Sequence, residues 1–255
     1  MKADVLNLDG KKLKTIELPE QFNEDYEPDL IKRAAIVIEN NRRMPYGTLP
    51  LAGQGYSAKL SRRRRDYKGA YGKGISRVPR KTMWKRGTQF SWVGALAPGT
   101  RGGRRAHPPK ASKDWTQKIN TKERKKAIRS ALSGLITTDN LVILDNKFET
   151  LKKLKEVKGV LQIIGMAVDA IKRNRAGKGK SRGRRIRYKV NALVVVAGEC
   201  SLINSIRNIP GYSVIEARNL NADVLTLNHD KLKKCLFTEA AIEKINKEKL
   251  FMVKK

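Results

Sequence analysis

The sequence is poor in cysteine, in histidine and in long apolar runs. Its 255 residues contain two cysteines, Cys200 and Cys235, which lie far apart in apolar surroundings, so we expect half-buried, reduced thiols without a disulfide. A zinc site needs more cysteine or histidine at short spacing than these two and His107 and His229 supply. No apolar run approaches the roughly 18 residues of a spanning helix, and the N-terminus lacks a signal core. We therefore expect a soluble, cytoplasmic protein with no metal, no cofactor and no membrane partner.

Acidic residues are also scarce. The chain has 24 Asp and Glu against 56 Lys and Arg, a formal net charge of +32. Such an excess implies a partner that supplies anions, which can be RNA, DNA or an anionic membrane. Hydrophobic residues make up 40% of the chain, which is enough for one core of ordinary size. One main domain follows.

The positive charge is concentrated in two segments. Residues 42–113 contain 19 Lys and Arg and one acidic residue, and residues 172–189 contain 10 Lys and Arg and no acid. The rest of the chain has 27 basic and 23 acidic residues, as in an ordinary globular domain. A solvated surface spreads its charge, whereas a nucleic-acid site concentrates it. The two segments are therefore predicted to bind nucleic acid.

The first basic segment has neither helical nor strand periodicity, because glycine and proline interrupt it every few residues. A connection of this length is expected to be disordered or ordered by a partner. Its aromatic residues alternate with Arg and Lys, a pairing that stacks on bases and neutralises phosphates. The run Arg62 to Arg65 can also be a solvated charge block, but this setting favours contact with phosphates. The aromatic residues are Tyr46, Tyr56, Tyr67, Tyr71, Trp84, Phe90 and Trp92.

The remaining chain alternates strand and helix patterns, which predicts an α/β fold: a single globular domain with a mainly parallel central sheet flanked by helices, plus a long irregular extended loop. Residues 1–41 and 114–255 form the globular domain in this prediction, residues 42–113 the inserted loop and residues 172–189 a second basic loop. Strands are expected at 3–7, 12–18, 141–145, 190–199 and 213–217, and helices at 28–43, 121–137, 149–157, 159–173, 201–208 and 238–248.

Enzyme motifs are weak. Residues 53–58, GQGYSA, match a loose dinucleotide-binding pattern but lack the strand before and the helix after that the motif requires. Gly179-Lys180-Ser181 resembles the end of a phosphate-binding loop, but the first glycine of that motif is missing. His107 and His229 have no orienting partner in sequence and are expected to be surface or RNA-contacting residues. An RNA-modifying enzyme with a basic, substrate-gripping loop remains the alternative, followed by a DNA-packing protein.

Six stretches, in this order and at these separations, resemble one family: DLIKRA, NRRMPYGT, GKGISRVPRKTMWKRGT, PGTRGGRRAHPPK, RAGKGKSRGRR and SLINSIRNIPG. Together they are similar to the universal large-subunit ribosomal protein L4 family in its archaeal and eukaryotic form. The chain lacks the long C-terminal extension of eukaryotic members, which favours an archaeal source. The resemblance implies a structural constituent of the large ribosomal subunit that binds its rRNA, assists assembly and is not an enzyme.

The resemblance also implies roles for individual residues. The tip of the loop is expected near residues 72–86, lining the nascent-peptide exit tunnel, with rRNA, neighbouring large-subunit proteins and the nascent peptide as partners and no homo-oligomer. The tip residues are Gly72, Gly74, Arg77, Val78, Pro79 and Arg80. The residues expected to bind rRNA are Arg42, Arg43, Tyr46, Tyr56, Arg62, Arg63, Arg64, Arg65, Lys68, Tyr71, Lys73, Arg77, Arg80, Lys81, Trp84, Lys85, Arg86, Trp92, Arg101, Arg104, Arg105, His107, Lys110, Arg173, Arg175, Lys178, Lys180, Arg182, Arg184, Arg185 and Arg187.

Overall fold

A computed structural model describes residues 1–66, 69–166 and 172–252 of the chain. It divides into two compact units. Unit 1 comprises residues 1–42 and 116–255, and unit 2 comprises residues 43–115. No helix in the described part of the chain is long and apolar enough to cross a membrane.

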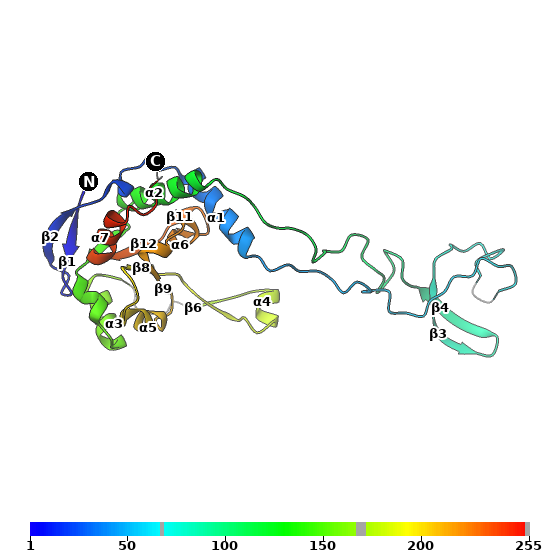
Figure 1. Ribbon diagram of the computed structural model, residues 1–255. Coiled ribbons are helices and arrows are strands. Elements are labelled where there is room, and N and C mark those ends of the chain that lie inside the picture. The colour runs from blue at the N-terminus through cyan, green and yellow to red at the C-terminus, as the bar shows by residue number, and fades with distance from the viewer. Residues whose placement is uncertain (67–68, 167–171, 253–255) are drawn as a thin grey trace. The chain divides into compact units, whose positions relative to one another are not determined.

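Unit 1 is built on a six-stranded sheet with the order β2-β1-β5-β12-β8-β9 (Figure 1). Strand β2 pairs antiparallel with β1, and all other neighbours in the sheet are parallel. The turn between β1 and β2 contains Gly10 at a φ of 74°. The strands are β1 (Lys2–Leu6), β2 (Lys12–Glu17), β5 (Leu141–Leu144), β8 (Ala192–Val196), β9 (Tyr212–Glu216) and β12 (Lys234–Thr238).

Helices cover both faces of the sheet. Along β8, Leu193 and Val195 belong to the core on one face, and Ala192, Val194 and Val196 belong to the core on the other. Because both faces are buried, the central strands are continuous apolar runs. The first core is closed by α1 (Pro28–Arg42), α2 (Thr121–Thr137), α6 (Ala222–Leu225) and α7 (Glu239–Lys247), and the second by α3 (Leu154–Ile163) and α5 (Leu202–Arg207).

Local sequence explains where the main helices begin. Helix α1 starts at Pro28, whose missing N–H costs nothing at the first helical position. In α7 the Thr238 hydroxyl accepts a hydrogen bond from the backbone N–H of Ala241 at 3.3 Å and caps the helix. The short elements of unit 1 are η1 (Glu20–Phe22), η2 (Asn146–Thr150), η3 (Ala217–Asn219), β10 (Thr226–Leu227) and β11 (Lys231–Leu232).

The predicted fold class is confirmed, but two predicted helices have other bounds and one strand of the central sheet was missed. The helix expected at 159–173 stops at Ile163, because Gly165 turns the chain at a φ of 75°, and residues 172–174 form a strand. Residues 167–171 of that expected helix lie outside the described residues. The helix expected at 149–157 begins at Leu154, after the 3-10 turn η2. Strand β12, in the middle of the sheet, was not predicted at all.

Candidate nucleic-acid interface

Unit 2 carries 18 Lys and Arg against two carboxylates, Asp66 and Asp114. Its side chains are largely exposed, and the run Arg62 to Arg65 is exposed throughout. Few hydrophobic side chains are buried in it; Ala58, Ala70 and Ala95 are examples. Unit 2 is therefore a surface of closely spaced cations with little apolar core.

Unit 2 is not irregular throughout. Strands β3 (Arg80–Arg86) and β4 (Gln89–Gly94) form an antiparallel hairpin closed by Gly87 at a φ of 56°. The register of the pair shifts between Thr82 and Trp84, which marks a β-bulge. The sequence pattern predicted no strand here, because the bulge and the exposed apolar residues remove the alternation that identifies a strand.

The two arms of unit 2, residues 43–71 and 87–113, approach each other closely. The N–H of Thr48 donates to the carbonyl of Pro109 at 3.2 Å, and a Cβ added at Gly47 would meet the nitrogen of Ala111 at 2.7 Å. Gly53, at a φ of 76°, lies against the backbone of Gly103. Side chains at these glycines would separate the arms, so glycine is needed for the backbones to pack.

Trp115, at the end of unit 2, contacts three side chains of the same unit. The guanidinium of Arg43 lies 3.9 Å from the Trp115 ring centroid, and the ammonium of Lys113 lies at 4.2 Å. The Tyr46 ring stacks on Trp115 with centroids 6.1 Å apart and planes 16° apart. Trp115 lies just beyond the basic segment counted in the sequence and was missed there. Its position next to a cluster of cations was the signal that could have found it.

Other aromatic rings of unit 2 also lie against cations of the same unit. The ammonium of Lys81 lies 3.9 Å from the Tyr56 ring centroid, and Arg64 lies over Tyr71 at 4.6 Å and donates to its hydroxyl at 2.6 Å. Trp92 has Arg80 at 5.3 Å, Lys73 at 5.8 Å and the edge-to-face ring of Phe90 at 5.2 Å. The structure thus brings many of the predicted RNA-contacting residues together in pairs.

The predicted tip residues lie just before the hairpin and at its start. Gly72 and Gly74 have φ values of 70° and 63°, and a Cβ at either would meet none of the described residues within 4 Å. Arg80 donates to the carbonyl of Val78 at 3.1 Å and to the hydroxyl of Ser76 at 3.2 Å, which folds this stretch back on itself. Lys68, also predicted to bind rRNA, lies outside the described residues.

The structure also shows the positions of other residues that were predicted to bind rRNA. Arg42 is the last residue of α1 in unit 1 and pairs with Asp223 at 2.8 Å. His107 and Lys110 line an open hollow of about 620 Å³ in unit 2, together with Tyr46 and Trp115. The predicted arginines that follow β4, namely Arg101, Arg104 and Arg105, are exposed.

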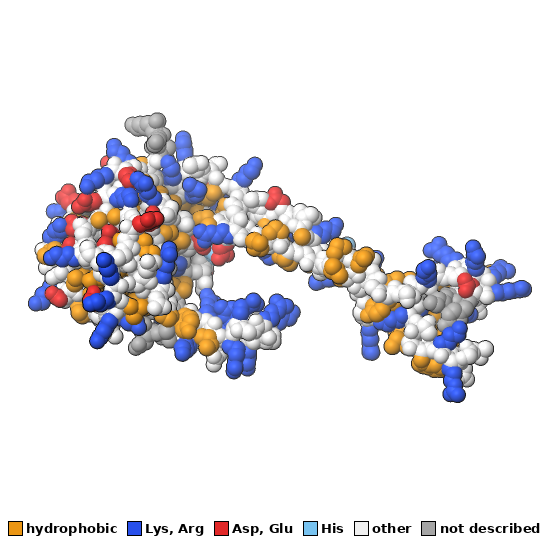
Figure 2. Space-filling model, turned by 60° about the horizontal axis from the view of Figure 1, so that its bottom comes forward, with side chains coloured by type: hydrophobic (Ala, Val, Ile, Leu, Met, Phe, Trp, Pro, Cys, Tyr) orange, Lys and Arg blue, Asp and Glu red, His pale blue; other side chains and the backbone are white. Residues whose placement is uncertain are grey.

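The second basic segment forms a hairpin of unit 1, not a loop. Strands β6 (Lys172–Asn174) and β7 (Ile186–Tyr188) pair antiparallel, and the one-turn helix α4 (Lys178–Ser181) lies between them. The N–H of Arg175 donates to the carbonyl of Arg185 at 2.7 Å. All ten Lys and Arg between residues 172 and 189 are exposed, and Figure 2 shows such side chains gathered over this hairpin. Like charges held this close favour an anion between them.

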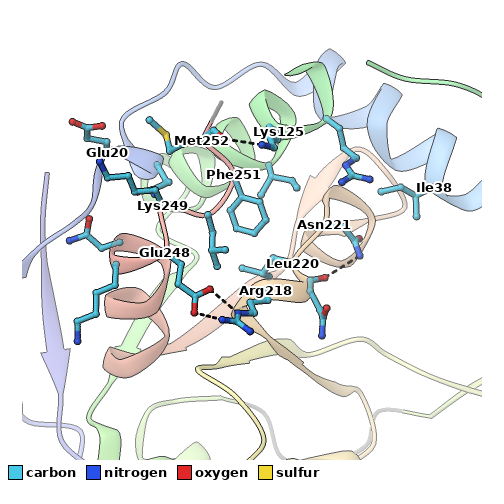
Figure 3. A pocket seen from close by; sticks show the side chains of 17 residues that line it. Glu20, Ile38, Lys125, Arg218, Leu220, Asn221, Glu248, Lys249, Phe251 and Met252 are labelled. Carbon is cyan, nitrogen blue, oxygen red and sulfur yellow. Dashed lines mark hydrogen bonds and ion pairs between the residues drawn. The ribbon is translucent and has the colours of Figure 1, made fainter. Parts of the chain in front are cut away.

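A cavity of unit 1 does not have the composition of a catalytic site. It measures about 1200 Å³ and lies in unit 1 between α7, the start of α2 and the segment after β9 (Figure 3). Among the described residues, its lining contains no Ser, Thr, Cys or His that could act as a nucleophile or a neutral base. Arg218 donates to both carboxylate oxygens of Glu248, which lowers the pKa of that carboxyl, and Lys125 donates to the carbonyl of Met252 at 2.9 Å.

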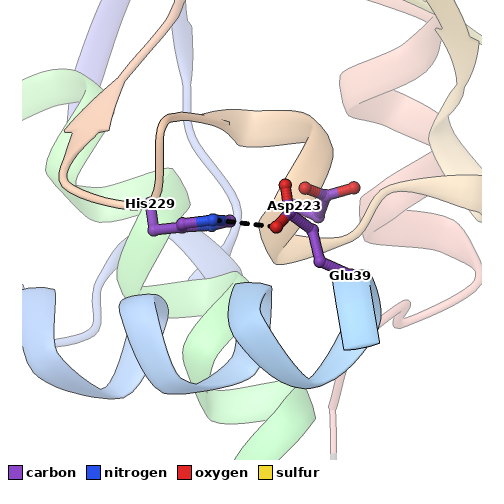
Figure 4. A group of neighbouring side chains, drawn as sticks. All are labelled: Glu39, Asp223 and His229. Carbon is purple, nitrogen blue, oxygen red and sulfur yellow. Dashed lines mark ion pairs between the residues drawn. The ribbon is translucent and has the colours of Figure 1, made fainter. Parts of the chain in front are cut away.

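Among the described residues, one group could hold a metal ion: Glu39 of α1, Asp223 of α6 and His229 of the β10–β11 turn (Figure 4). Their potential ligand atoms lie within 4.8 Å of one another. The carboxylates already have partners, because His229 Nε2 lies 3.1 Å from Glu39 and Arg42 lies 2.8 Å from Asp223. These contacts fasten α6 and the turn to α1, and we assign the group a structural role.

The sheet with helices on both faces and the two basic extensions are those of an α/β nucleic-acid-binding protein. The chain belongs to the ribosomal protein L4/L1 family, whose model matches residues 16–248. It is 39% identical to the large ribosomal subunit protein uL4 of Nanoarchaeum equitans, over 98% of this chain and 100% of the relative. The uL4 proteins of Archaeoglobus fulgidus and Methanocaldococcus jannaschii are 36% and 38% identical, over 95% and 96% of this chain and 97% and 98% of their own.

Proposed function

We propose that unit 2 and the β6–β7 hairpin are the two surfaces by which this protein holds large-subunit rRNA. As a member of a ribosomal protein family, the chain is a structural component of the large ribosomal subunit and not an enzyme. It works in the cytoplasm, within the ribosome, in company with the RNA and proteins of that subunit. The alternative of an RNA-modifying enzyme has no support in the family.

The observation that carries the proposal is the local shortage of anions. Unit 2 offers two carboxylates to its 18 cations, and residues 172–189 offer none to ten. Most of these cations therefore have no carboxylate available within their own segment. Phosphates of converging RNA strands supply the missing charge, and releasing their counterions favours binding.

Within unit 2 we assign different roles to different parts. The arms, residues 43–71 and 87–113, contact RNA and assist assembly of the subunit. The tip, residues 72–86, lines the nascent-peptide exit tunnel with Arg77, Pro79 and Arg80 at its centre, and its remaining basic and aromatic residues also contact RNA. The open surroundings of Gly72 and Gly74 support this role, because no described residue of unit 2 would lie within 4 Å of a Cβ there.

Salt dependence tests the RNA contact. Each lost phosphate contact flattens the slope of log K against log salt by roughly 0.7 to 0.9, so changing Arg62 to Arg65 together to Ala should flatten it by about 3. Binding is measured on deproteinised large-subunit rRNA over a range of salt concentrations. The matched control changes four exposed lysines of unit 1, namely Lys147, Lys152, Lys153 and Lys155, and should keep the wild-type slope. An unchanged slope in the arginine variant would make that run a solvated charge block.

The tip has a separate test. Arg77→Ala and Arg80→Ala should change nascent-chain stalling in subunits that assemble at the normal level, because the tip contacts the peptide. Arg101→Ala, in an arm, serves as the control. Normal stalling combined with poor assembly in the tip variants would show that Arg77 and Arg80 belong to the RNA-binding surface and not to the tunnel lining.

A further inference from the structure

Trp84 differs from the other described aromatic residues of unit 2. The rings of Tyr46, Tyr56, Tyr71 and Trp92 each lie against a cation of the same unit. Trp84 is 53% exposed, and within the described residues no ring or cation lies over it. A large apolar ring left open on so basic a surface needs a partner.

The β-bulge in β3 explains why Trp84 is exposed. Residues paired across two strands share a face of the hairpin. Thr82 pairs with Trp92, whereas Trp84 pairs with Ser91, so the bulge places Trp84 on the face opposite Thr82 and Trp92. Regular alternation would have put Trp84 on the face where Trp92, Phe90 and Arg80 already pack together.

The same register defines the neighbours of Trp84. Lys81 pairs with Val93 and Arg86 pairs with Gln89, which places both cations on the face of Trp84, one toward each end of β3. Val93, also on this face, is 43% exposed. Residues 80–94 contain no Asp or Glu, so the charged side chains that share this face with the open aromatic ring are all cations.

We propose that Trp84 is a stacking platform for an unpaired base of large-subunit RNA, with Lys81 and Arg86 placed for the phosphates on either side. This inference rests on the proposed function of unit 2. Every base has a face that can stack, and a tryptophan flanked by cations suits a single-stranded nucleotide. A purely acidic partner would leave the Trp84 ring without a stacking contact, and a purely apolar partner would leave Lys81 and Arg86 without an anion. The arrangement therefore favours RNA over a protein neighbour.

The test compares full-length variants for binding to deproteinised large-subunit rRNA. Trp84→Ala should weaken binding roughly tenfold, since stacking on one base contributes on the order of one to two powers of ten in affinity. The salt slope should stay at its wild-type value, because no charge is lost. Trp84→Phe should retain most of the affinity, and Met83→Ala, which trims another exposed residue of β3, should bind as wild type.

The possible outcomes distinguish a failure of the role proposed for Trp84 from a failure of the RNA-binding function proposed for unit 2. Wild-type protein that binds rRNA without salt dependence would refute the proposed RNA surface itself. Salt-dependent binding that is equal in wild type and Trp84→Ala would leave that surface intact and overturn the role of Trp84. Unchanged RNA binding with altered nascent-chain stalling would show that the ring meets the peptide, and would also overturn it.

Discussion

Cys235 lies on β12 in the centre of the sheet, with no exposed surface, and Cys200 is partly exposed. Both are free thiols, as the sequence predicted, although Cys235 is more deeply buried than expected. Burial raises the pKa of the Cys235 thiol from an ordinary value of 9.0 to about 12. Burial likewise raises the pKa of Tyr212, on β9, to about 12. These groups keep their protons in the folded protein at a pH where the unfolded chain loses them.

That difference predicts a loss of stability at alkaline pH. The folded state binds more protons than the unfolded state between pH 9 and about 12, so the free energy of unfolding falls as pH rises through this window. One such thiol lowers the free energy of unfolding by up to about 1.4 kcal/mol for each pH unit in this window. Urea unfolding from pH 8 to 11 should show Cys235→Ala with a shallower fall than wild type. Cys200→Ala is the control, and the effect of Tyr212 is common to all three proteins.

A shallow fall that is identical in wild type and Cys235→Ala would contradict this assignment. A second readout is thiol labelling at pH 8. Cys200 should react with an aromatic disulfide reagent before Cys235, and unfolding should make both react at once, because the thiolate is the reactive form.

Hydrophobic periodicity predicted the helices that bury one clear face and the strands that consist of a long apolar run. The helix expected at 28–43 is α1, where Ile31, Ala34 and Ala35 are buried at helical spacing. Strand β12 could not be recognised, because its apolar part, Cys235 to Phe237, is short and follows Lys233 and Lys234. Its central place comes from parallel pairing with β5 and β8, which distant parts of the chain supply.

The β3–β4 hairpin was hidden for a different reason. Sequence patterns identify strands by the burial of alternate residues, and β3 has exposed residues at five consecutive positions, 82–86. Its bulge also breaks the alternation. Several ring–cation pairs escaped notice because they join residues distant in sequence, such as Tyr56 with Lys81 and Arg43 with Trp115. The clustering of Lys and Arg in the sequence identified both basic segments, but it could not predict the contacts within them.

The packing of the arms gives a prediction about glycine. Gly53→Ala should separate the arms, because Ala is strained at a φ of 76° and its Cβ would overlap the backbone of Gly103. The strain at positive φ alone costs about 1 kcal/mol. Gly55→Ala is the matched control, because a Cβ at Gly55 meets nothing within 4 Å in the part of the chain that the structure describes. Hydrogen exchange of the Arg104 amide, bonded to the Leu96 carbonyl at 3.3 Å, should become faster only in Gly53→Ala. Equal exchange in both variants would show that the arms do not need this contact.

At the scale of the molecule, the two units differ in what holds them together. Unit 1 has two apolar cores, one on each face of its sheet, and unit 2 has a hairpin, ring–cation pairs and exposed arms. The exposed cations of unit 2, such as Lys59, Arg62 and Lys110, are sites for trypsin. Free protein should therefore be cut within residues 43–115, as well as within the β6–β7 hairpin, and protected at both when bound to rRNA.

The cut protein should nevertheless stay together. The N-terminal fragment keeps β1 paired with β5 and α1 packed in the core with α2, so it should elute with the C-terminal fragments in size-exclusion chromatography without denaturant. Denaturant should release it. An N-terminal fragment that separates in native buffer would show that the continuous chain, and not the core, holds α1 in place. Resistance of residues 43–115 equal to that of unit 1 would count against ordering of the arms by RNA.

The chain leaves unit 1 after Arg42 and re-enters it at Thr116, and a reciprocal pair of hydrogen bonds joins the two crossing points. The side-chain amide of Asn41 donates to the Gln117 carbonyl at 3.1 Å and accepts from the Gln117 N–H at 2.8 Å. With the ends fixed together, doubling the length of the insertion would cost the fold only about 0.6 kcal/mol of closure entropy. Evolution can therefore lengthen, shorten or rewrite the inserted segment to follow a changing RNA while the sheet beneath it stays the same.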